Sequence, residues 1–301
     1  MRRAPVRVDA IPPHAFFVVS AVFHYLGPAF AVLLFARVDP LGVAWLRIAT
    51  AAAVFALWRR PWRFWGALGR DGRRTVVAWA CALAAMNSFF YLSIDRLPLS
   101  TVAAIEFAGP IALAAVGVRS RRNALALVLA VAGVYTLTGI RIAGEPAGFA
   151  FAFANAALFA VYVVLGHRAA NHAGVSGIDA LGASMLVAAA IATPFGVWDA
   201  PRALLDPLAI AAGAGVGVTS SVIPYVCDQL ALARLSRATY ALFVALLPAT
   251  ATVVGLVVLG QVPGVAELAG VALVVAGVAV HQERATRPEV PVTAAPAPAP
   301  S

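Results

Sequence analysis

Long apolar runs alternate with short polar punctuation along the whole chain. Arg, Pro, Gly and Asp residues divide the sequence into ten runs, each close to the roughly 17–25 residues that a bilayer-spanning helix needs. The runs cover 14–36, 39–58, 75–94, 100–118, 123–140, 147–167, 177–198, 206–231, 238–259 and 264–281. The connections are mostly short, so we expect successive helices to pack as antiparallel neighbours. The pattern therefore predicts ten transmembrane helices.

The composition indicates whether lipid or water surrounds these helices. The residues AVILMFWYC make up 62% of the 301 residues, charged residues make up only 12%, and the mean hydropathy is +0.90. A soluble domain has about 45–50% apolar and about 25% charged residues. A water-soluble globule of this length could not bury so much apolar surface, so lipid must cover most of it. We therefore expect an all-α membrane protein.

Arginine supplies all 22 basic side chains, and its distribution predicts the topology. Seventeen arginines lie in the N-terminal segment, the connections on one side of the predicted membrane and the C-terminal tail, whereas four lie in the opposite connections. Because cytoplasmic connections carry the positive excess, residues 1–13 and the Pro/Ala-rich tail 282–301 are predicted to be cytoplasmic, the tail as a disordered segment. Topology explains the net charge of +9, so no nucleic-acid partner is expected.

The two halves of the chain repeat each other. The segment RLPLSTVAAIEFAGP (96–110) matches RLSRATYALFVALLP (234–248) at a constant offset of 138 residues. Each half, 14–140 and 147–281, holds five predicted helices, and this odd number inverts the second half relative to the first. Inverted repeats are typical of secondary transporters, whose substrate site lies near the midplane between the halves. Chance similarity between Ala/Val/Leu-rich helices is the alternative.

Glu106 is the most informative single residue. It lies six residues into the helix predicted over 100–118, about 9 Å from its nearer end at 1.5 Å per residue. A carboxylate at that depth is costly unless it is paired, protonated or facing water, and such residues mark proton and substrate pathways. We interpret Glu106 as a substrate- or proton-binding group. A structural hydrogen bond across helices is the alternative.

Two polar residues of the preceding helix lie at a similar depth. The turn is centred near Leu97, so Asn87, ten residues before it, and Glu106, nine residues after it, reach nearly the same level. Tyr91 follows Asn87 by four residues and shares its face. Together these groups could hold the charged amino group and the polar part of a small zwitterion. An Asn–Glu hydrogen bond between helices would explain them without a ligand.

Further polar residues could complete the wall of such a site. Asn155 and Tyr162 are seven residues apart and share a helix face, and Tyr225 stands at the repeat position of Asn87. Arg47 lies about ten residues from either end of its helix and needs an anionic partner, either the carboxylate described above or that of a substrate. For each of these residues, a satisfied core position is the alternative.

Three prolines fall inside predicted helices. Pro110 lies one turn below Glu106, Pro248 is its repeat mate, and Pro224 follows a Thr-Ser-Ser run. A proline removes a helical hydrogen bond and kinks the helix, and interrupted helices at corresponding positions of two halves point to a binding site. A kink without any ligand is the alternative.

The chain also resembles a known family over residues 14–281. The run MNSFFYLSIDRLPLSTVAAIEFAGP (86–110), together with LGVAWLRIA (41–49), FAVYVVLGHRAA (159–170) and IPYVCDQLALARL (223–235), resembles the EamA type of the drug/metabolite transporter superfamily. Within it, MN-x3-YLSI followed by EF-x-GP is similar to the inner-membrane threonine/homoserine exporters.

The resemblance implies a function as well as a fold. It implies a multi-pass protein of the bacterial plasma (inner) membrane that exports small amino acids such as threonine or homoserine by proton exchange. Its partners would be the lipid bilayer, a proton and a small polar metabolite. Leu247 and Gln261 stand where the family often carries acids. A broader metabolite or drug exporter of the same superfamily is therefore the alternative.

Other classes of function lack the residues that they need. The sequence has no G-x-x-x-x-G-K-[ST] motif of an ATP-driven pump and no His/Cys cluster with metal-ligand spacing, so neither a cofactor nor a metal site is expected. A membrane-embedded enzyme would need a nucleophile–base pair or a metal set in one helical layer, and none is visible. A receptor or scaffold would usually carry an appended soluble domain, whereas the longest cytoplasmic connection is only 59–74.

Overall fold

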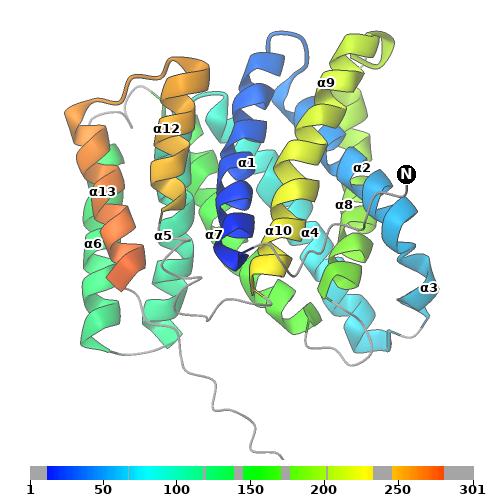
Figure 1. Cartoon of the computed structure of the whole chain (residues 1–301), viewed down its shortest axis with the longest axis horizontal. Coiled ribbons are helices and arrows are strands. Elements are labelled where there is room, and N and C mark those ends of the chain that lie inside the picture. The colour runs from blue at the N-terminus through cyan, green and yellow to red at the C-terminus, as the bar shows by residue number, and fades with distance from the viewer. Residues whose placement is uncertain are drawn as a thin grey trace, which may run out of the picture.

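The chain forms a bundle of helices in the computed structural model, and each of the ten predicted runs contains a helix (Figure 1). The structure describes residues 12–66, 68–117, 120–138, 145–170, 177–200, 203–232 and 246–280. Those ranges contain no strand. Six of their helices are long and apolar enough to cross a membrane. The fold is therefore that of a multi-pass membrane protein.

Five long helices come from the first half of the chain. They are α1 (Pro13–Leu34), α2 (Pro40–Arg59), α4 (Arg70–Ile94), α5 (Leu99–Gly117) and α6 (Arg121–Thr138). Both α1 and α2 begin with a proline, whose fixed φ suits the first helical turn and whose missing N–H is not needed there. The short helix α3 (Trp62–Trp65) lies within the Arg-rich connection between α2 and α4.

The second half supplies the remaining elements. They are α7 (Pro146–Ala170), α8 (Gly177–Asp199), the 3-10 turn η2 (Ala203–Leu205), α9 (Pro207–Gly217), the π-helical turn η3 (Val218–Val222), α10 (Ile223–Leu232), α12 (Leu247–Leu259) and α13 (Val265–Val280). The helix predicted over 206–231 is thus formed by α9, the π turn η3 and α10 in direct succession. The first part of the helix predicted over 238–259 and both chain ends, 1–11 and 281–301, lie outside the described residues.

The helices run up and down through the bundle in an order that mixes the two halves (Figure 1). Helix α6 packs against α13, α5 against α12, α2 against α8, α4 against α7, and α1 against α10 and α12. We call the end that is uppermost in Figure 1 the upper end, where the connections between α1 and α2 and between α12 and α13 lie. Helix pairs from opposite halves thus enclose the interior.

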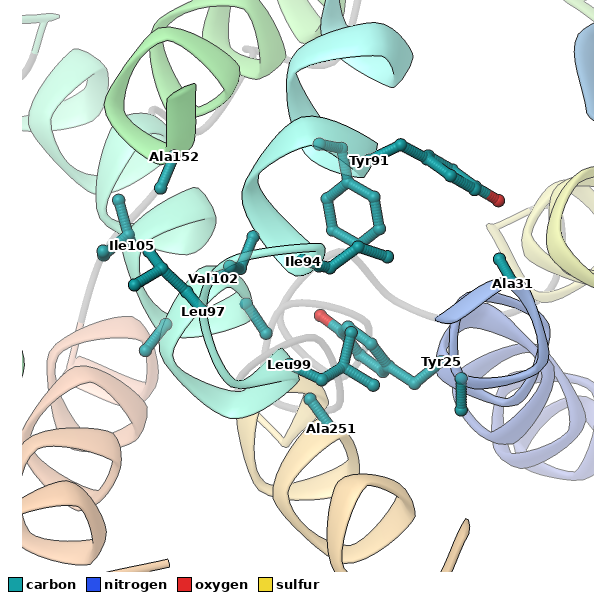
Figure 2. Packing of buried hydrophobic residues seen from close by; sticks show 14 of the residues in the cluster. Tyr25, Ala31, Tyr91, Ile94, Leu97, Leu99, Val102, Ile105, Ala152 and Ala251 are labelled. Atoms are coloured by element: carbon teal, nitrogen blue, oxygen red, sulfur yellow. The ribbon is translucent and has the colours of Figure 1, made fainter. Parts of the chain in front are cut away.

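The interior holds two clusters of buried apolar side chains. One extends along the bundle between α1, α5, α6, α12 and α13 and includes residues of α2, α4, α7 and α9. Figure 2 shows part of it, with Tyr25 from α1, Tyr91 from α4, Leu99 from α5 and Ala251 from α12. The other lies between α2, α4 and α8. Buried polar residues lie among these apolar side chains, and they form the site described next.

Candidate functional site

Four polar side chains from four helices lie in one layer below the upper end. Tyr25 lies nine residues before the end of α1, and Asn155 lies nine residues after the start of α7. Arg47 and Glu106 each lie seven residues after the start of their helices, α2 and α5. At 1.5 Å per residue, these positions are about 10–14 Å from the helix ends. All four residues are buried.

Contacts between the helix ends show that these depths refer to the same end of the bundle. The ring of Phe35, directly after α1, meets the ring of Tyr91 near the end of α4 edge-on, with centroids 6.1 Å apart. At the start of α7, a Cβ on Gly148 would lie 3.0 Å from the Cγ of Leu97 in the turn before α5. The four polar residues therefore form one layer.

Glu106 has an amide partner from α7. The Nδ2 of Asn155 donates to Oε1 of Glu106 at 3.1 Å. The close approach of α5 and α7 permits this bond, because a Cβ on Gly109 would lie only 2.4 Å from the carbonyl oxygen of Ala156. The glycine one turn after Glu106 and the alanine next to Asn155 thus set the separation at which the two side chains meet.

Arg47 is bound by α9 and its π turn. Its Nε donates to Oγ of Ser221 at 2.8 Å, and one terminal nitrogen donates to the carbonyl oxygen of Ser220 at 3.0 Å. That carbonyl would accept from residue 224 in a regular α-helix, but Pro224 has no N–H, so Arg47 takes the place of the missing donor. The guanidinium carbon also lies 5.6 Å from the centroid of the Tyr91 ring, a cation–π contact.

Arg47 and Glu106 form no ion pair with each other, and within the described ranges no other carboxylate pairs with Arg47. They are nevertheless close enough to attract each other electrostatically. Each is held by neutral groups of its own. The layer therefore offers a cation and an anion, on separate helices, that can bind the carboxylate and the ammonium group of one zwitterion.

Four polar atoms around this layer have no hydrogen-bond partner. They are the hydroxyls of Tyr25 and Tyr91, Oδ1 of Asn155 and Oγ of Ser220, and all four residues have no exposed surface. A buried polar atom without a partner costs about 1–3 kcal/mol. Such atoms are rare in folded proteins, so several of them around one buried cation and anion require an explanation.

Two predicted site residues, Asn87 and Tyr91, have different surroundings in the structure. Asn87 is buried, but its Nδ2 donates to the carbonyl oxygen of Leu83 in its own helix at 2.8 Å. The amide on Glu106 is Asn155, which comes from the second half of the chain. Tyr91, predicted to accompany Asn87, lies instead beside Arg47.

Tyr162 lies about two helical turns below Asn155 on α7, outside the layer, whereas Tyr225 lies at its edge. Tyr162 stacks on Phe159 with centroids 6.2 Å apart, and its centroid is 5.5 Å from that of Trp79, so it belongs to the contact between α4 and α7. Tyr225 is buried on α10 within the cluster between α2, α4 and α8. It lies close enough to Arg47 for the two to interact electrostatically.

The three predicted helix breaks have three different structures. The π turn η3 ends two residues before Pro224. Pro248 lies in the first turn of the described part of α12, where proline is well tolerated. Helix α5 continues through Pro110. Near Pro224, Asp228 of α10 accepts a hydrogen bond from Oγ of Ser20 at 2.5 Å.

A second buried carboxylate was not foreseen. Glu267 lies in the first turn of α13 and accepts hydrogen bonds from Oγ of Ser100 and, at 3.5 Å, from Oγ1 of Thr101. Next to it, Oε1 of Gln261 accepts from the backbone N–H of Leu99 at 3.1 Å. The Ser-Thr pair at the start of α5 was the signal available in the sequence. These contacts tie the start of α5 to the connection between α12 and α13.

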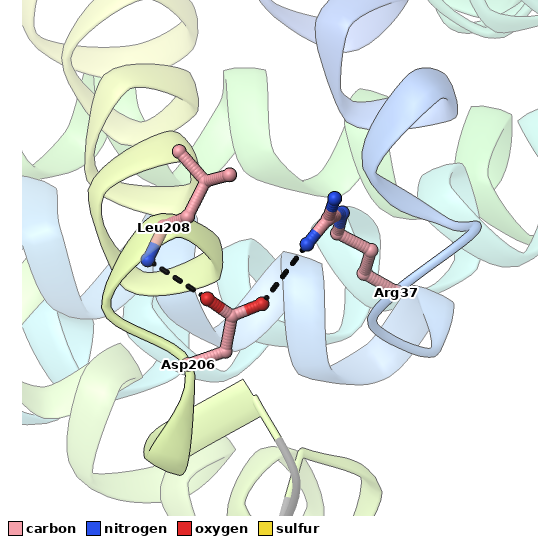
Figure 3. Close-up of polar contacts among 3 residues, drawn as sticks. All are labelled: Arg37, Asp206 and Leu208. Atoms are coloured by element: carbon pink, nitrogen blue, oxygen red, sulfur yellow. Dashed lines mark hydrogen bonds and ion pairs between the residues drawn. The ribbon is translucent and has the colours of Figure 1, made fainter.

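An exposed ion pair links two other connections at the upper end (Figure 3). One terminal nitrogen of Arg37 lies 3.2 Å from Oδ2 of Asp206, while Oδ1 of Asp206 accepts from the backbone N–H of Leu208 at 2.9 Å and caps α9. The Leu208 N–H and then the Arg37 guanidinium lower the pKa of Asp206 below its ordinary value. This carboxylate stabilises the fold and lies outside the polar layer.

The lateral surface carries an apolar cavity of about 790 Å³ between α5, α6 and α7. Its lining includes Gly109, Val131 and Tyr135, and the latter two are exposed on the outside of the bundle. The cavity therefore opens toward the surroundings of the protein, and Glu106 does not line it. In the described ranges no group of three or more His, Cys, Asp or Glu side chains could hold a metal ion.

Comparisons with known proteins agree with the motifs. A family model described as the EamA-like transporter family matches residues 146–281. The chain is 32% identical over 241 residues to the threonine/homoserine exporter RhtA of Escherichia coli (strain K12), a match that covers 78% of this chain and 79% of that protein. It is 33% identical, with the same coverage, to RhtA of Salmonella typhimurium (strain LT2). A solved crystal structure at 20% identity shares the fold, with a TM-score of 0.58 over 89% of this chain and 96% of that one.

Proposed function

The chain belongs to the EamA-like transporter family, and we propose that it exports small amino acids such as threonine or homoserine from bacteria in exchange for protons. The family resemblance predicted from the motifs is thereby confirmed, and the relatives are transporters rather than enzymes. The observation that carries the proposal is a buried Arg47 and a buried Glu106 in one layer, each held only by neutral groups. A zwitterionic substrate needs this pair of charges.

The binding mode follows from the chemistry of the two groups. The planar guanidinium of Arg47 binds the substrate carboxylate, because its N–H groups match the two oxygens. Glu106 binds the substrate ammonium group, and the unpartnered Oδ1 of Asn155 accepts a further N–H bond from it. Tyr91 supports Arg47 from one side, and Tyr225 contributes to the field around it from α10. Asn87 lies at the depth of the layer on α4, and Tyr162 lies about two turns below it on α7, at the cytoplasmic boundary of the proposed site.

Proton exchange follows from Glu106 being the one carboxylate among the four residues of the layer. When Glu106 carries a proton it has no charge with which to bind an ammonium group, so proton and substrate compete for the same oxygens. A proton bound from outside is released when substrate binds from inside, and the protein carries one or the other in each direction. Intramembrane carboxylates serve as proton relays in transporters for this reason. The π turn before Pro224, together with Pro110 and Pro248, supplies the places at which the helices bend during alternating access.

The architecture that we propose is a pair of inverted five-helix repeats, 14–140 and 147–281. The packing supports it, because helices at equivalent places in the two halves contact each other: α2 with α8, α5 with α12, and α6 with α13. Two further sets of pairs are also related by the exchange of halves. Helix α4 packs on α7 as α10 packs on α1, and α5 packs on α7 as α12 packs on α1. An internal twofold relation between the halves produces such a pattern.

We place the upper end outside the cell and both chain termini in the cytoplasm. The lower end carries residues 59–74, the end of α2, the connection and the start of α4, which hold six of the 22 arginines. The positive-inside rule therefore assigns the lower end to the cytoplasm. The 17-to-4 distribution of arginines supports the same orientation, with the protein in the bacterial inner membrane. A reporter fused after Ser301 is expected to be active only as a cytoplasmic reporter.

Exchange of labelled amino acids in proteoliposomes tests the function. Vesicles loaded with unlabelled threonine or homoserine are expected to accumulate external labelled threonine transiently, because the protein exchanges one molecule for another. Protein-free vesicles and vesicles with the Arg47→Gln variant serve as controls, and neither should accumulate label. If the folded wild type exchanges no amino acid but exchanges another polar metabolite or drug, the broader exporter is the correct function.

A further inference from the structure

Tyr25 is the buried side chain for which the proposed function has not yet found a role. It has no exposed surface, and its hydroxyl has no hydrogen-bond partner. Figure 2 shows the side chain extending from α1 into the interior, among Leu99 of α5 and Ala251 of α12. The empty protein therefore gains nothing from this hydroxyl.

A phenylalanine would fill the same space without the penalty of an unpaired oxygen. A tyrosine at this position is thus explained only by a partner that the protein alone does not contain. The hydroxyl lies in the layer of Arg47 and Glu106, nine residues below the upper end of α1, and it is close enough to Glu106 to interact with it electrostatically. It therefore forms a third polar point beside the two charged ones.

We propose that the Tyr25 hydroxyl recognises the side-chain hydroxyl of the substrate, so that the site selects small hydroxylated amino acids over apolar ones of the same size. The inference rests on the proposed amino-acid export. A hydroxyl can both donate and accept, so Tyr25 pairs with a substrate hydroxyl in either sense. A site that leaves a buried polar group unpaired discriminates strongly against a substrate without the matching group.

Tyr91 and Ser220 carry the other unpartnered hydroxyls of the layer, but both are placed differently. The ring of Tyr91 lies against the guanidinium of Arg47. A Cβ on Gly27 would lie only 2.0 Å from Oγ of Ser220, so the backbone of α1 covers that hydroxyl. Ser220 instead uses its carbonyl oxygen to bind Arg47. The two roles are therefore separate: the Ser220–Ser221 turn positions the guanidinium, and Tyr25 contacts the side chain of the substrate.

Threonine and valine make the sharpest pair of probes, because they have nearly the same shape and differ by a hydroxyl in place of a methyl group. Each is used unlabelled to inhibit exchange of labelled threonine in proteoliposomes. The wild type is expected to prefer threonine, and Tyr25→Phe should lower that preference by roughly fivefold to tenfold through weaker threonine binding alone. Tyr135→Phe, a tyrosine on the outer surface with 75% exposure, is the matched control and should keep the wild-type preference.

Thermal unfolding without substrate separates recognition from a structural role. If the hydroxyl has no partner in the empty protein, Tyr25→Phe should unfold at the wild-type temperature or a few degrees higher, and it should lose the extra stabilisation by threonine. A variant that unfolds several degrees lower, or that keeps the wild-type preference for threonine, overturns the role of Tyr25 and leaves amino-acid export intact. A wild type that exchanges no amino acid overturns both proposals.

Discussion

Two buried carboxylates at α5 differ in their hydrogen-bond partners. Glu106 lies on α5 itself, and Glu267 of α13 contacts the start of α5. Glu106 is 5% exposed and Glu267 is 8% exposed. Glu267 lies in the first turn of its helix and receives hydrogen bonds from two hydroxyls at the start of α5. Glu106 lies deeper, receives one bond from an amide, and is surrounded by polar atoms without partners.

The difference shows that burial alone does not identify a functional acid. A carboxylate in a first helical turn is stabilised by the helix dipole, and with hydroxyl donors in place it acts as a permanent link between elements. A carboxylate that receives few hydrogen bonds can exchange its partners, because its oxygens still have room for a proton or for the ammonium group of a substrate. We therefore assign exchange of ligands to Glu106 and a structural role to Glu267.

The largest expected effect is the loss of coupled transport in Glu106→Gln. The substitution keeps the shape and an oxygen that can accept from Asn155, so the protein should insert and fold, but it removes the group that binds either proton or ammonium. Accumulation of threonine driven by a pH step in proteoliposomes should fall to the level of protein-free vesicles. Glu267→Gln, the matched variant, should retain it, and equal loss in both variants would contradict the assignment.

The close approach of α5 and α7 near Glu106 provides the next test. Gly109→Ala places a methyl group 2.4 Å from the carbonyl oxygen of Ala156, so α5 and α7 must move apart. We expect a loss of about 1–3 kcal/mol in unfolding free energy, together with weaker threonine binding because Asn155 no longer reaches Glu106. Gly215→Ala in α9 is the control, since nothing lies within 4 Å of the added carbon. A neutral Gly109→Ala variant would show that the close approach is not needed.

A double-mutant cycle tests the link formed by Glu267. Glu267→Ala and Ser100→Ala should each lower stability, and their coupling should be on the order of 1 kcal/mol because each variant leaves the other's partner unpaired. Denaturant unfolding of the two single variants and the double variant measures it. Exchange of labelled threonine per folded protein should stay at the wild-type level. Additive effects on stability would contradict the link.

The smallest effect is expected at the exposed pair of Arg37 and Asp206, where the sign depends on pH. The pKa of Asp206 is lowered in the folded protein, so its stabilising effect is present at neutral pH and is lost as pH falls below the ordinary value of 3.8. Asp206→Asn keeps the acceptor for the Leu208 N–H and loses only the charge. The variant should unfold at a slightly lower temperature than the wild type at pH 7 and at the same temperature in acid. A difference that persists in acid would point to the cap instead.

The sequence predicted the positions of the helices along the chain better than the contacts between them. Apolar runs and Arg or Pro boundaries located all ten helix-containing segments, because the length of a span and the cost of charge in lipid leave little freedom. The cost of charge in lipid also singled out Glu106, because it is a carboxylate inside an apolar run. Its partner was not identified, because depth along a helix can be counted but rotation cannot. The contact between Gly109 and Ala156 turns Glu106 toward Asn155 and away from Asn87.

Two further features needed the packed structure. Pro224 predicted an interruption, but the bond from Arg47 to the freed carbonyl of Ser220 depends on how α2 lies against α9. Glu267 was not singled out from the sequence, because its hydroxyl partners lie more than 160 residues away in the chain. In both cases a contact between the two halves supplied the missing partner, and contacts of that kind leave no local pattern.

Threonine affinity as a function of pH is the most direct test of the central claim that proton and substrate compete for Glu106. Binding is measured on the purified protein by calorimetry, with wild type and Glu106→Gln in parallel. The wild type is expected to lose affinity as pH falls, because protonation removes the charge that binds the ammonium group, while the weaker binding of Glu106→Gln should not change with pH. An equal pH dependence in both proteins would place proton binding at another residue and contradict the claim.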